Sequence, residues 1–330
     1  MAHGAGGKAT RRLIDGLFAP ILYEGPSPEL GDAAQVVIDG TRIALTTDGF
    51  VVTPLIFPGS SIGELAVNGT VNDLAVGGAR AISLVVSFVL EAGLDSKVLE
   101  REVRAMSAAA RSAGVTIVGG DTKVVEHGKT DQMYITTTGV GQLFPGLTLN
   151  PRSVKTGDRI LLSGPIGDHG ITILLARGEL DIEADLRSDS RCVLPMVTAL
   201  VNAMPGSIRW MRDPTRGGVA TSLNELALDC GLSIHLSEEA IPVRDEVRGA
   251  CELLGLDPLH IANEGQFLAV VAADAADEAL RLVRNVPGGE EARLIGEVRE
   301  EPAAAVLVAT LYGGTRIVDM LVGDPLPRIC

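Results

Sequence analysis

Aromatic and basic residues are scarce in this chain of 330 residues. Phe, Trp and Tyr make up only 3% of it, so stacking platforms of the kind that bind single-stranded nucleic acid are not expected. Lys and Arg total 28 against 42 Asp and Glu, which gives a net charge of −14. Nucleic-acid backbones and anionic membranes repel such a chain, and neither is expected as its main partner.

Cysteines and long apolar stretches are few as well. The four cysteines show no CxxC pair and no zinc-like spacing, which argues against a structural metal site. The apolar stretch over 81–90 is interrupted by two serines and is far too short to span a membrane. The chain does not open with a basic region followed by an apolar one. We therefore expect a cytoplasmic protein with reduced thiols.

The abundant residues indicate a globular protein of two domains. Hydrophobic residues make up 46% of the sequence, and 330 residues exceed the size of one ordinary core. Strand and helix patterns alternate in both halves, which predicts an α+β or α/β fold for each. We expect a flexible glycine-rich segment over 1–30, an N-terminal domain over 31–150, a C-terminal domain over 151–319 and a mobile tail over 320–330.

Local signals in the N-terminal half predict a hairpin and two helices. Asp39-Gly40 lies between two apolar runs, which is typical of a β-hairpin turn. Ser61 followed by Glu64 is a capping box, and it predicts that a helix begins there. A second helix is predicted over 95–112, because a glycine follows shortly after the last periodic residue.

Five aspartates lie at the ends of apolar runs or beside glycines, where no charge is needed for solubility. Hard cations such as Mg²⁺ prefer carboxylate oxygens, and converging carboxylates are tolerated when a metal neutralises them. Each one alone is explained as readily by a turn or a helix cap. Together they are the candidate magnesium ligands: Asp32, Asp48, Asp73, Asp121 and Asp213.

The predicted helix over 61–78 contains an unusual number of residues that disfavour helices. Small and amide side chains concentrate where the pattern otherwise predicts a helix. Such a departure from local propensity is typical of a ligand site, although a loop would also explain it. Asn68 and Asn72 are four positions apart and face the same side. They are our candidate nucleotide contacts.

A glycine loop opens the chain and offers a second set of anion contacts. Gly6 and Gly7 precede Lys8, and the backbone N–H groups of such a loop can hold a phosphate. The loop lacks the Walker A pattern, and no strand precedes it. A flexible terminus explains these glycines as well.

Other candidate groups follow predicted strands or begin helices. Thr122 and Lys123 come directly after an aspartate, and the lysine offers a cation to a phosphate that carboxylates alone would repel. Arg216, in DPTRGG, lies at a predicted helix start, where anions are favoured. Glu264 precedes an apolar strand and is a candidate general base, although an exposed loop carboxylate is the common alternative.

Cys330 is the last residue of the sequence and follows two prolines. Cys192, Cys230 and Cys251 lie in helical or apolar contexts, where a cysteine acts as a small hydrophobe. Cys330 at the end of an extended tail has no core to fill, so we expect a reactive or carrier thiol. Little of an ordinary thiol is ionised at neutral pH. We therefore expect a partner to load Cys330 before it enters a site.

Taken in order, these motifs resemble the aminoimidazole-ribonucleotide-synthetase superfamily. The motifs that carry the resemblance span nearly the whole chain: HGAGG, LGDAA, TTDGF, NGTVNDLAVGGA, VGGDTKV, DPTRGG and ANEG. The terminal PRIC resembles one branch, the carbamoyl dehydratases of nickel–iron hydrogenase maturation. The resemblance implies a two-domain fold whose N-terminal sheets join two copies into a homodimer.

The resemblance also implies an activity. ATP would bind in a cleft with Mg²⁺ on the five aspartates, and Lys123 and Glu264 would lie at the reacting amide. A carbamoyltransferase, HypF, would place a carboxamide on Cys330. ATP-dependent dehydration would turn it into a thiocyanate, and the cyano group would pass to iron held by the HypC–HypD scaffold.

Two alternatives stay open at this point. The first is another enzyme of the superfamily, such as thiamine-monophosphate kinase or selenophosphate synthetase. The selenium enzyme carries its reactive residue near the N-terminus, where this chain has no cysteine. The second is a scaffold that binds nucleotide and partners without turnover.

Overall fold

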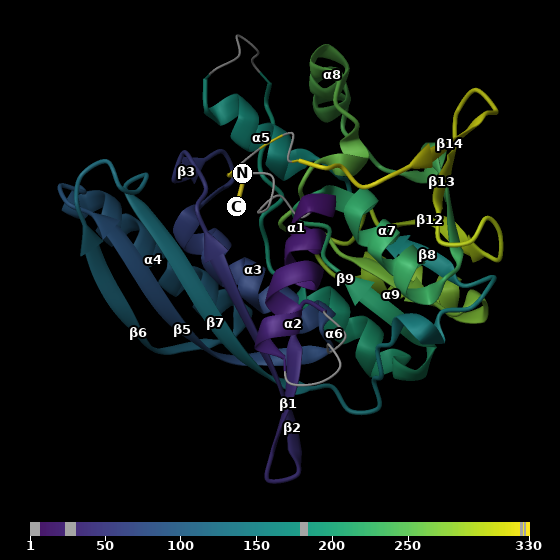
Figure 1. Cartoon of the computed structure of the whole chain (residues 1–330), viewed down its shortest axis with the longest axis horizontal. Helices are drawn as coiled ribbons and strands as arrows, with labels where there is room; N and C mark the ends of the chain where they lie inside the picture. The colour runs from purple at the N-terminus through teal and green to yellow at the C-terminus, as the bar shows by residue number, and fades with distance from the viewer. Residues whose placement is uncertain (1–6, 24–30, 179–183, 324–325, 327) are drawn as a thin grey trace.

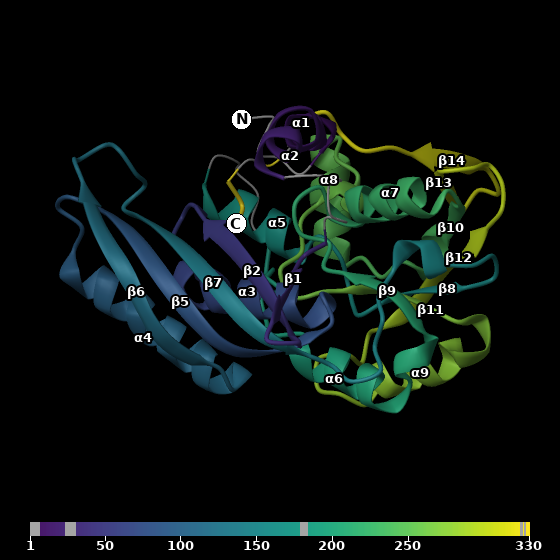
Figure 2. The ribbon, with the colours of Figure 1, turned by 60° about the horizontal axis from the view of Figure 1, so that its bottom comes forward.

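A computed structural model describes residues 7–23, 31–178, 184–323, 326 and 328–330. Two large β-sheets, one in each half of the chain, lie side by side with helices between and around them (Figures 1 and 2), and β3 (Ile56–Phe57) and β4 (Ser60–Ser61) form a small two-stranded sheet. None of the helices in the described ranges has the length and apolar character needed to cross a membrane. The α+β class expected from the alternating patterns is confirmed.

The N-terminal sheet has five strands in the order β1-β2-β7-β5-β6. Asp39 and Gly40 adopt φ values of 49° and 80°, so the predicted hairpin turn is confirmed between β1 and β2. Only β5 and β6 pair in parallel, and α4 makes the crossover between them. The strands are β1 (Ala34–Ile38), β2 (Thr41–Phe50), β5 (Ala79–Glu91), β6 (Thr116–Val125) and β7 (Met133–Leu143).

Two helices cover one face of this sheet. They are α3 (Ile62–Val76) and α4 (Ser96–Ala113), and within the described residues no helix lies over the other face of β5 and β6 (Figure 2). Apolar side chains are therefore exposed on these strands and on the β1 edge: Ile82, Val85, Val118, Val124, Val36, Val37 and Ile38. An uncovered apolar sheet face of this kind marks an interaction surface.

The helix predicted to begin at Ser61 is real, but its predicted capping box is wrong. Ser61 is the N-cap residue, yet its side chain makes no capping hydrogen bond. The backbone N–H of Gly63 instead donates to Glu102 Oε2 at 3.0 Å, from α4. Glu102 is fully buried, so a carboxylate that is distant in sequence stabilises the positive end of α3.

The C-terminal sheet has seven strands in the order β14-β13-β10-β12-β8-β11-β9, with α7 on one face and α9 on the other. Its strands are β8 (Arg159–Leu162), β9 (Ile208–Arg212), β10 (Ser233–Ser237), β11 (Leu268–Val271), β12 (Arg293–Arg299), β13 (Val306–Ala309) and β14 (Thr315–Val318). The helices of this half are α5 (Asp168–Ala176), α6 (Leu194–Ala203), α7 (Gly218–Cys230), α8 (Asp245–Leu254) and α9 (Ala276–Arg284).

The two halves share one hydrophobic core, and α3 lies at its centre. Thirteen of the 15 residues of α3 are buried, because the helix contacts its own sheet on one side and α6 of the other half on another. A helix enclosed in this way is apolar around most of its circumference. The few polar side chains on α3 therefore face buried groups of both halves.

The two ends of the chain are also held against the body. Residues 8–22, predicted as flexible, form α1 (Lys8–Leu13), a π-helical turn (Ile14–Phe18) and α2 (Ala19–Leu22). Lys8 forms an ion pair with Asp319 at 2.5 Å, which ties α1 to the segment that precedes the tail. The chain end marked C lies between the N-terminal sheet and α5 in both views (Figures 1 and 2).

The close contact between α3 and α4 gives a prediction about stability. A Cβ atom at Gly63 would lie 2.2 Å from the Glu102 carbonyl oxygen, so Gly63→Ala must push the two helices apart. We expect a loss of about 1–3 kcal/mol in the free energy of unfolding, measured by denaturant titration.

Gly249→Ala is the matched control for this substitution. Gly249 lies within α8, and a Cβ atom there would meet nothing within 4 Å. Alanine favours a helix, so this variant should gain about 0.5–1 kcal/mol. Equal effects of the two substitutions would contradict the packing argument.

Candidate active site

Four of the five predicted aspartates meet where the two halves join. Asp32 precedes β1, Asp48 lies near the end of β2 and Asp73 lies on α3. Asp213 comes from the other half, directly after β9, and its side chain is fully buried. The structure thus brings these four candidate residues together, and their role as magnesium ligands stays a prediction.

The four carboxylates are close enough to disturb one another electrostatically. Burial raises the pKa of Asp73 well above its ordinary value, and the charges of Asp213, Asp32 and Asp48 raise it further. Burial and the charges of Asp32 and Asp48 do the same to the pKa of Asp213. Like charges gathered in a poorly solvated place oppose ionisation. The site therefore favours a cation.

Two arginines neutralise part of this charge. Arg212 contacts Asp32 at 3.1 Å and Glu225 at 2.7 Å, so burial raises the Asp32 pKa only to about 6. Arg216 contacts Asp48 at 3.4 Å. It lies at the predicted start of α7, where Gly217 and Gly218 have positive φ values of 77° and 61°. That helix start is confirmed.

Glu264 lies beside this cluster, and its carboxyl group is buried with an unpartnered oxygen. Among the described residues, no group forms a hydrogen bond with Glu264 Oε1. Burial raises the pKa of Glu264 well above its usual range, and the charges of Asp213 and Asp48 add to the effect. The exposed-loop alternative is therefore wrong, and the raised pKa favours the neutral carboxyl, so Glu264 must ionise before it can accept a proton.

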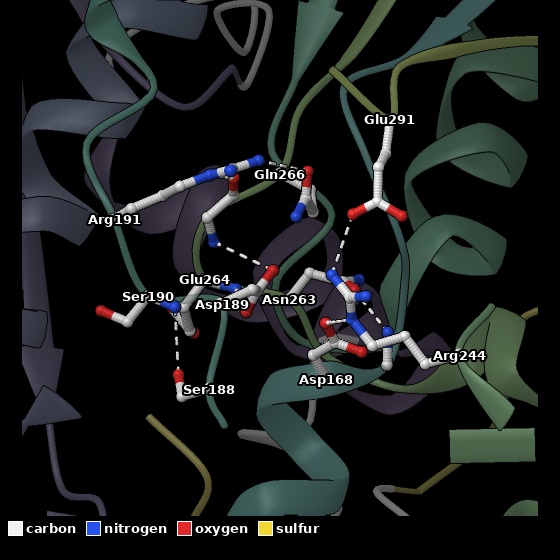
Figure 3. A network of polar contacts seen from close by, with 12 residues as sticks. Asp168, Ser188, Asp189, Ser190, Arg191, Arg244, Asn263, Glu264, Gln266 and Glu291 are labelled. Atoms are coloured by element: carbon white, nitrogen blue, oxygen red, sulfur yellow. Dashed lines mark hydrogen bonds and ion pairs between the residues drawn. The ribbon is translucent and has the colours of Figure 1, made fainter. Parts of the chain in front are cut away.

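The backbone around Glu264 is held by side chains that the sequence did not single out (Figure 3). Asp189 accepts hydrogen bonds from the N–H groups of Glu264, at 3.1 Å, and Gly265, at 3.3 Å. Arg191 donates to the Gly265 carbonyl at 2.8 Å and to Gln266 Oε1 at 3.0 Å. The segment that carries Asp189 and Arg191 has no regular element and therefore no periodic pattern.

The buried side chain of Asn72 also holds the backbone around Glu264 and does not face an open cleft. Its amide NH₂ donates to the carbonyls of Arg191, at 2.9 Å, and Glu264, at 3.2 Å. Its carbonyl oxygen accepts from the N–H of Val193 at 2.8 Å. In this conformation Asn72 therefore positions the backbone beside Glu264, while Asn68 lies buried one helical turn earlier.

Asp121, Thr122 and Lys123 do not join this cluster within one chain. They lie on β6, the edge strand, and β7 and β5 separate β6 from the strand that carries Asp48. Asp121 and Lys123 pair with each other at 2.7 Å, with side chains 59% and 67% exposed. Strand order therefore sets Asp121 apart from the other four aspartates within one chain, and its role as a magnesium ligand stays a prediction.

Gly7, the described residue of the N-terminal glycine loop, packs closely against another part of the backbone. A Cβ atom at Gly7 would lie 2.2 Å from the Leu321 carbonyl oxygen, so the close approach of two backbones explains this glycine. Lys8 is paired with Asp319 instead of facing the aspartate cluster. Gly6 lies outside the described residues.

Cys330 is buried, in contrast with the exposed position expected for it. Its side chain joins the core shared by the two halves, and its carbonyl oxygen accepts from the N–H of Val51 at 3.0 Å. Burial raises the pKa values of the thiols of Cys192, Cys230 and Cys251, which keeps them neutral. These three fit the interpretation as small hydrophobes, and Cys330 alone ends beside the strand that carries Asp48.

The aspartates suit magnesium by their chemistry but do not form a finished cage. Within the parts of the chain that the structure describes, no three His, Cys, Asp or Glu side chains are arranged to hold a metal ion by themselves. Mg²⁺ commonly takes only one or two carboxylates and completes its shell with phosphate oxygens and water. The raised pKa values of Asp73 and Asp213 show that these carboxylates feel one another's charge, which a cation would offset.

Family comparisons cover both domains. The description "AIR synthase related protein, N-terminal domain" matches residues 31–143, and "AIR synthase related protein, C-terminal domain" matches residues 155–309. The carbamoyl dehydratase HypE of Azotobacter vinelandii is 51% identical over 330 residues, which are 100% of this chain and 96% of that protein.

Solved structures agree with this relationship. A HypE–HypF complex contains a chain that is 42% identical, with a TM-score of 0.88, over 94% of this chain and 99% of its own. A HypE structure in complex with ATP is 45% identical, with a TM-score of 0.84, over 99% of this chain and 98% of its own.

The repulsion among the aspartates gives a prediction about pH. Because the folded-state pKa of Asp73 is raised, its contribution to stability is present at low pH and is lost as pH rises through that pKa. In EDTA and without nucleotide, Asp73→Asn should therefore gain thermal stability over the unsubstituted protein as pH rises from about 5 to about 8. The gain should reach about 3 °C.

The control is Asp274→Asn, at an exposed position outside the cluster. Its difference from the unsubstituted protein should not change with pH. A pH-independent difference for Asp73→Asn would contradict the electrostatic account.

Proposed function

This chain belongs to the AIR synthase related family and, within it, to the carbamoyl dehydratases called HypE, and from that premise we propose how its own residues carry out the reaction. It uses ATP to dehydrate a carboxamide on the Cys330 sulfur to a thiocyanate, which supplies the cyanide ligand of the hydrogenase iron centre. The observation that carries the proposal is that Cys330 is buried in the core shared by the two halves, where Glu264 is also buried and its Oε1 has no hydrogen-bond partner among the described residues.

The positions of Cys330 and Glu264 are linked through Phe50. Cys330 is hydrogen-bonded to Val51, the residue after Phe50. A Cβ atom at Gly69 would meet the Phe50 ring at 2.8 Å and Glu264 Oε2 at 3.9 Å, so these two side chains meet over Gly69. The end of the tail therefore binds the residue next to Phe50, and the Phe50 ring lies near the candidate base.

The first step makes the amide oxygen a leaving group. The carboxamide oxygen attacks the γ-phosphorus of ATP, ADP leaves, and the nitrogen loses one proton. Phosphoryl transfer depends chiefly on positioning and on charge neutralisation. Arg216 at the start of α7 and Lys123 supply positive charge for the phosphates.

The second step removes phosphate. The C–O bond breaks, inorganic phosphate leaves, the nitrogen loses its second proton, and a carbon–nitrogen triple bond remains on the sulfur. Glu264 accepts a proton, and its raised pKa makes it an effective base once it is ionised. Its unpartnered oxygen is the atom available for the N–H of the carboxamide. The buried surroundings exclude water, which would hydrolyse the activated amide.

Magnesium fits the same cluster. Asp32, Asp48, Asp73 and Asp213 are the residues that would hold it, and the ion would neutralise the β- and γ-phosphates. Thr46 donates to Asp73 Oδ2 at 2.9 Å, which fixes the orientation of that carboxylate. With aromatic residues scarce, the adenine would rest on aliphatic and backbone groups.

In a homodimer, Lys123 and Asp121 could reach the aspartate cluster of the partner chain, which they do not reach in their own chain. Lys123 and Asp121 lie on an exposed edge strand next to the uncovered apolar face of the same sheet. Covering that face with a second copy would bury the apolar side chains and place the β6 edge of one chain against its partner. We therefore place Lys123 and Asp121 at the site of the partner chain.

The partners follow from the reaction. A carboxamide donor must load Cys330, and the HypE–HypF complex supports HypF in that role. The thiocyanate must then pass to iron, which we assign to the HypC–HypD scaffold. A scaffold without turnover does not explain why Glu264 is buried with an oxygen that has no hydrogen-bond partner among the described residues.

Mass spectrometry of the C-terminal peptide tests the reaction. After incubation with ATP, Mg²⁺, carbamoyl phosphate and HypF, the peptide should carry a carboxamide that has lost the mass of one water. Glu264→Gln should keep ATP binding and retain the intact carboxamide, because loading precedes the proton transfer.

Cys330→Ala is the companion variant. It should bind ATP nearly as well as the unsubstituted chain and carry no modification. Water loss at normal rate in Glu264→Gln would remove Glu264 from the base role. An unmodified terminus in the unsubstituted chain would contradict the dehydratase reaction as a whole.

Mixed dimers test whether the site is shared between chains. Lys123→Ala and Glu264→Gln chains should each be inactive alone. If Glu264 of one chain works with Lys123 of its partner, random mixing should restore about a quarter of the dehydration rate, because half of the dimers then contain one intact site. No recovery, in dimers shown to be mixed by two different tags, would place both residues in one chain.

A further inference from the structure

The last three residues of the chain are held through their backbone carbonyls. The Arg328 carbonyl accepts from Arg177 Nη2 at 2.8 Å, and the Ile329 carbonyl accepts from His169 Nε2 at 2.6 Å. The terminal carboxylate of Cys330 accepts from the Val51 N–H at 3.0 Å. Two donors from α5 and its C-cap residue, and one from the segment after β2, thus contact backbone oxygens of three successive residues.

His169 is fixed in one protonation state by its surroundings. A carbonyl oxygen only accepts, so Nε2 of His169 carries the hydrogen and donates it to Ile329. Nδ1 then accepts from Ser188 Oγ at 2.8 Å. The ring is fully buried, packs edge-on against Phe57 with centroids 5.6 Å apart, and has its pKa lowered to about 4 by burial. It is therefore a neutral donor at physiological pH.

Arg177 joins the tail to the N-terminal half. Its Nε donates to the Thr53 carbonyl at 3.1 Å while Nη2 donates to Arg328, so one planar guanidinium spans two backbones. On the other side, the Arg328 side chain pairs with Asp131, in the loop between β6 and β7. Tyr134 also donates to Asp131 at 2.7 Å. The tail is therefore held by both halves at once.

None of these backbone contacts involves the sulfur of Cys330. A group added to that sulfur leaves all three carbonyls unchanged. The same donors therefore hold the thiol, the carboxamide and the thiocyanate in one register. Moving the chain by one residue would place Ile329 or nothing at the site, so the register decides which side chain reaches Glu264.

We propose that His169 and Arg177 are positioning residues that set the register of the tail by binding its backbone carbonyls, and so hold Cys330 at the site through every chemical state of its sulfur. This inference rests on the proposed function for its consequence in catalysis, but the docking itself is independent of that function. Loading by a partner requires these bonds to open. Weakening them should therefore favour loading and disfavour dehydration.

His169→Phe and His169→Gln form the test pair. Phenylalanine keeps the ring against Phe57 and removes the donor, whereas glutamine can still donate an N–H near the position of Nε2. In full-length protein, alkylation of Cys330 by iodoacetamide should be about tenfold faster in His169→Phe, as expected for the loss of one buried hydrogen bond. His169→Gln should stay near the unsubstituted rate.

The catalytic readout separates positioning from general damage. His169→Phe should accept the carboxamide from HypF at least as fast as the unsubstituted chain, bind ATP equally well and dehydrate about tenfold more slowly. Equal alkylation rates in His169→Phe and the unsubstituted chain would overturn the proposal. A His169→Gln variant as defective as His169→Phe would also overturn it, because the donor would then not be the property that matters.

A second variant keeps the test valid if His169→Phe fails to fold. Arg177→Lys removes the planar fork but keeps the charge, and it should also speed the alkylation of Cys330. Arg159→Lys is its control, because Arg159 Nε donates to the Gly296 carbonyl at 3.3 Å, in the C-terminal sheet and away from the tail. If the alkylation rates follow the prediction but the chain does not dehydrate the carboxamide, the proposed function is refuted. The role of His169 and Arg177 in holding the tail would still stand.

Discussion

Repulsion among buried carboxylates is the constraint on which the site depends. Asp73 and Asp213 come from different halves of the chain. The charge of Asp213 raises the pKa of Asp73, and the charges of the neighbouring aspartates Asp32 and Asp48 raise the pKa values of both. Such a cluster costs stability until a cation or a bound phosphate with its metal arrives. Arg212 and Arg216 offset only part of the charge. The joint between the halves is therefore less stable when empty than it would be with a cation bound, which is the property that the proposed magnesium–nucleotide site uses.

Helix α3 makes that arrangement possible. It is buried in both halves at once, so its polar side chains reach groups that no surface helix could contact. Asn72 donates a hydrogen bond to the backbone carbonyl of Glu264. Glu102, on α4, accepts a hydrogen bond from the first turn of α3. Asp189 completes the support from a segment without regular structure. Glu264 is thus fixed through its backbone, which leaves its carboxyl group for the substrate.

The end of the tail, unlike the side chains of the site, is held through its backbone oxygens. Cys330 is bound by its carbonyl and by the carbonyls before it, while its sulfur takes part in none of the three backbone hydrogen bonds. Recognition through the backbone suits a carrier whose side chain changes at each step. Under the proposed function it also explains how a residue that is loaded by a partner can be buried here, since three hydrogen bonds, the Arg328–Asp131 pair and a few apolar contacts can open without unfolding a domain.

The sequence alone was enough for the local elements and for most of the chemical inventory. The hairpin at Asp39-Gly40, the helix after Ser61 and the acids that meet at the joint follow from turn chemistry, periodicity and residue type. Strand order, however, separates Lys123 from the cluster, and contacts between segments far apart in sequence bring Asp189 to Glu264 and His169 to Ile329. Such contacts leave no periodic signal, because one side chain binding a distant backbone imposes no pattern on its neighbours. The sequence therefore determined which groups were available, and the tertiary structure decided which of them meet.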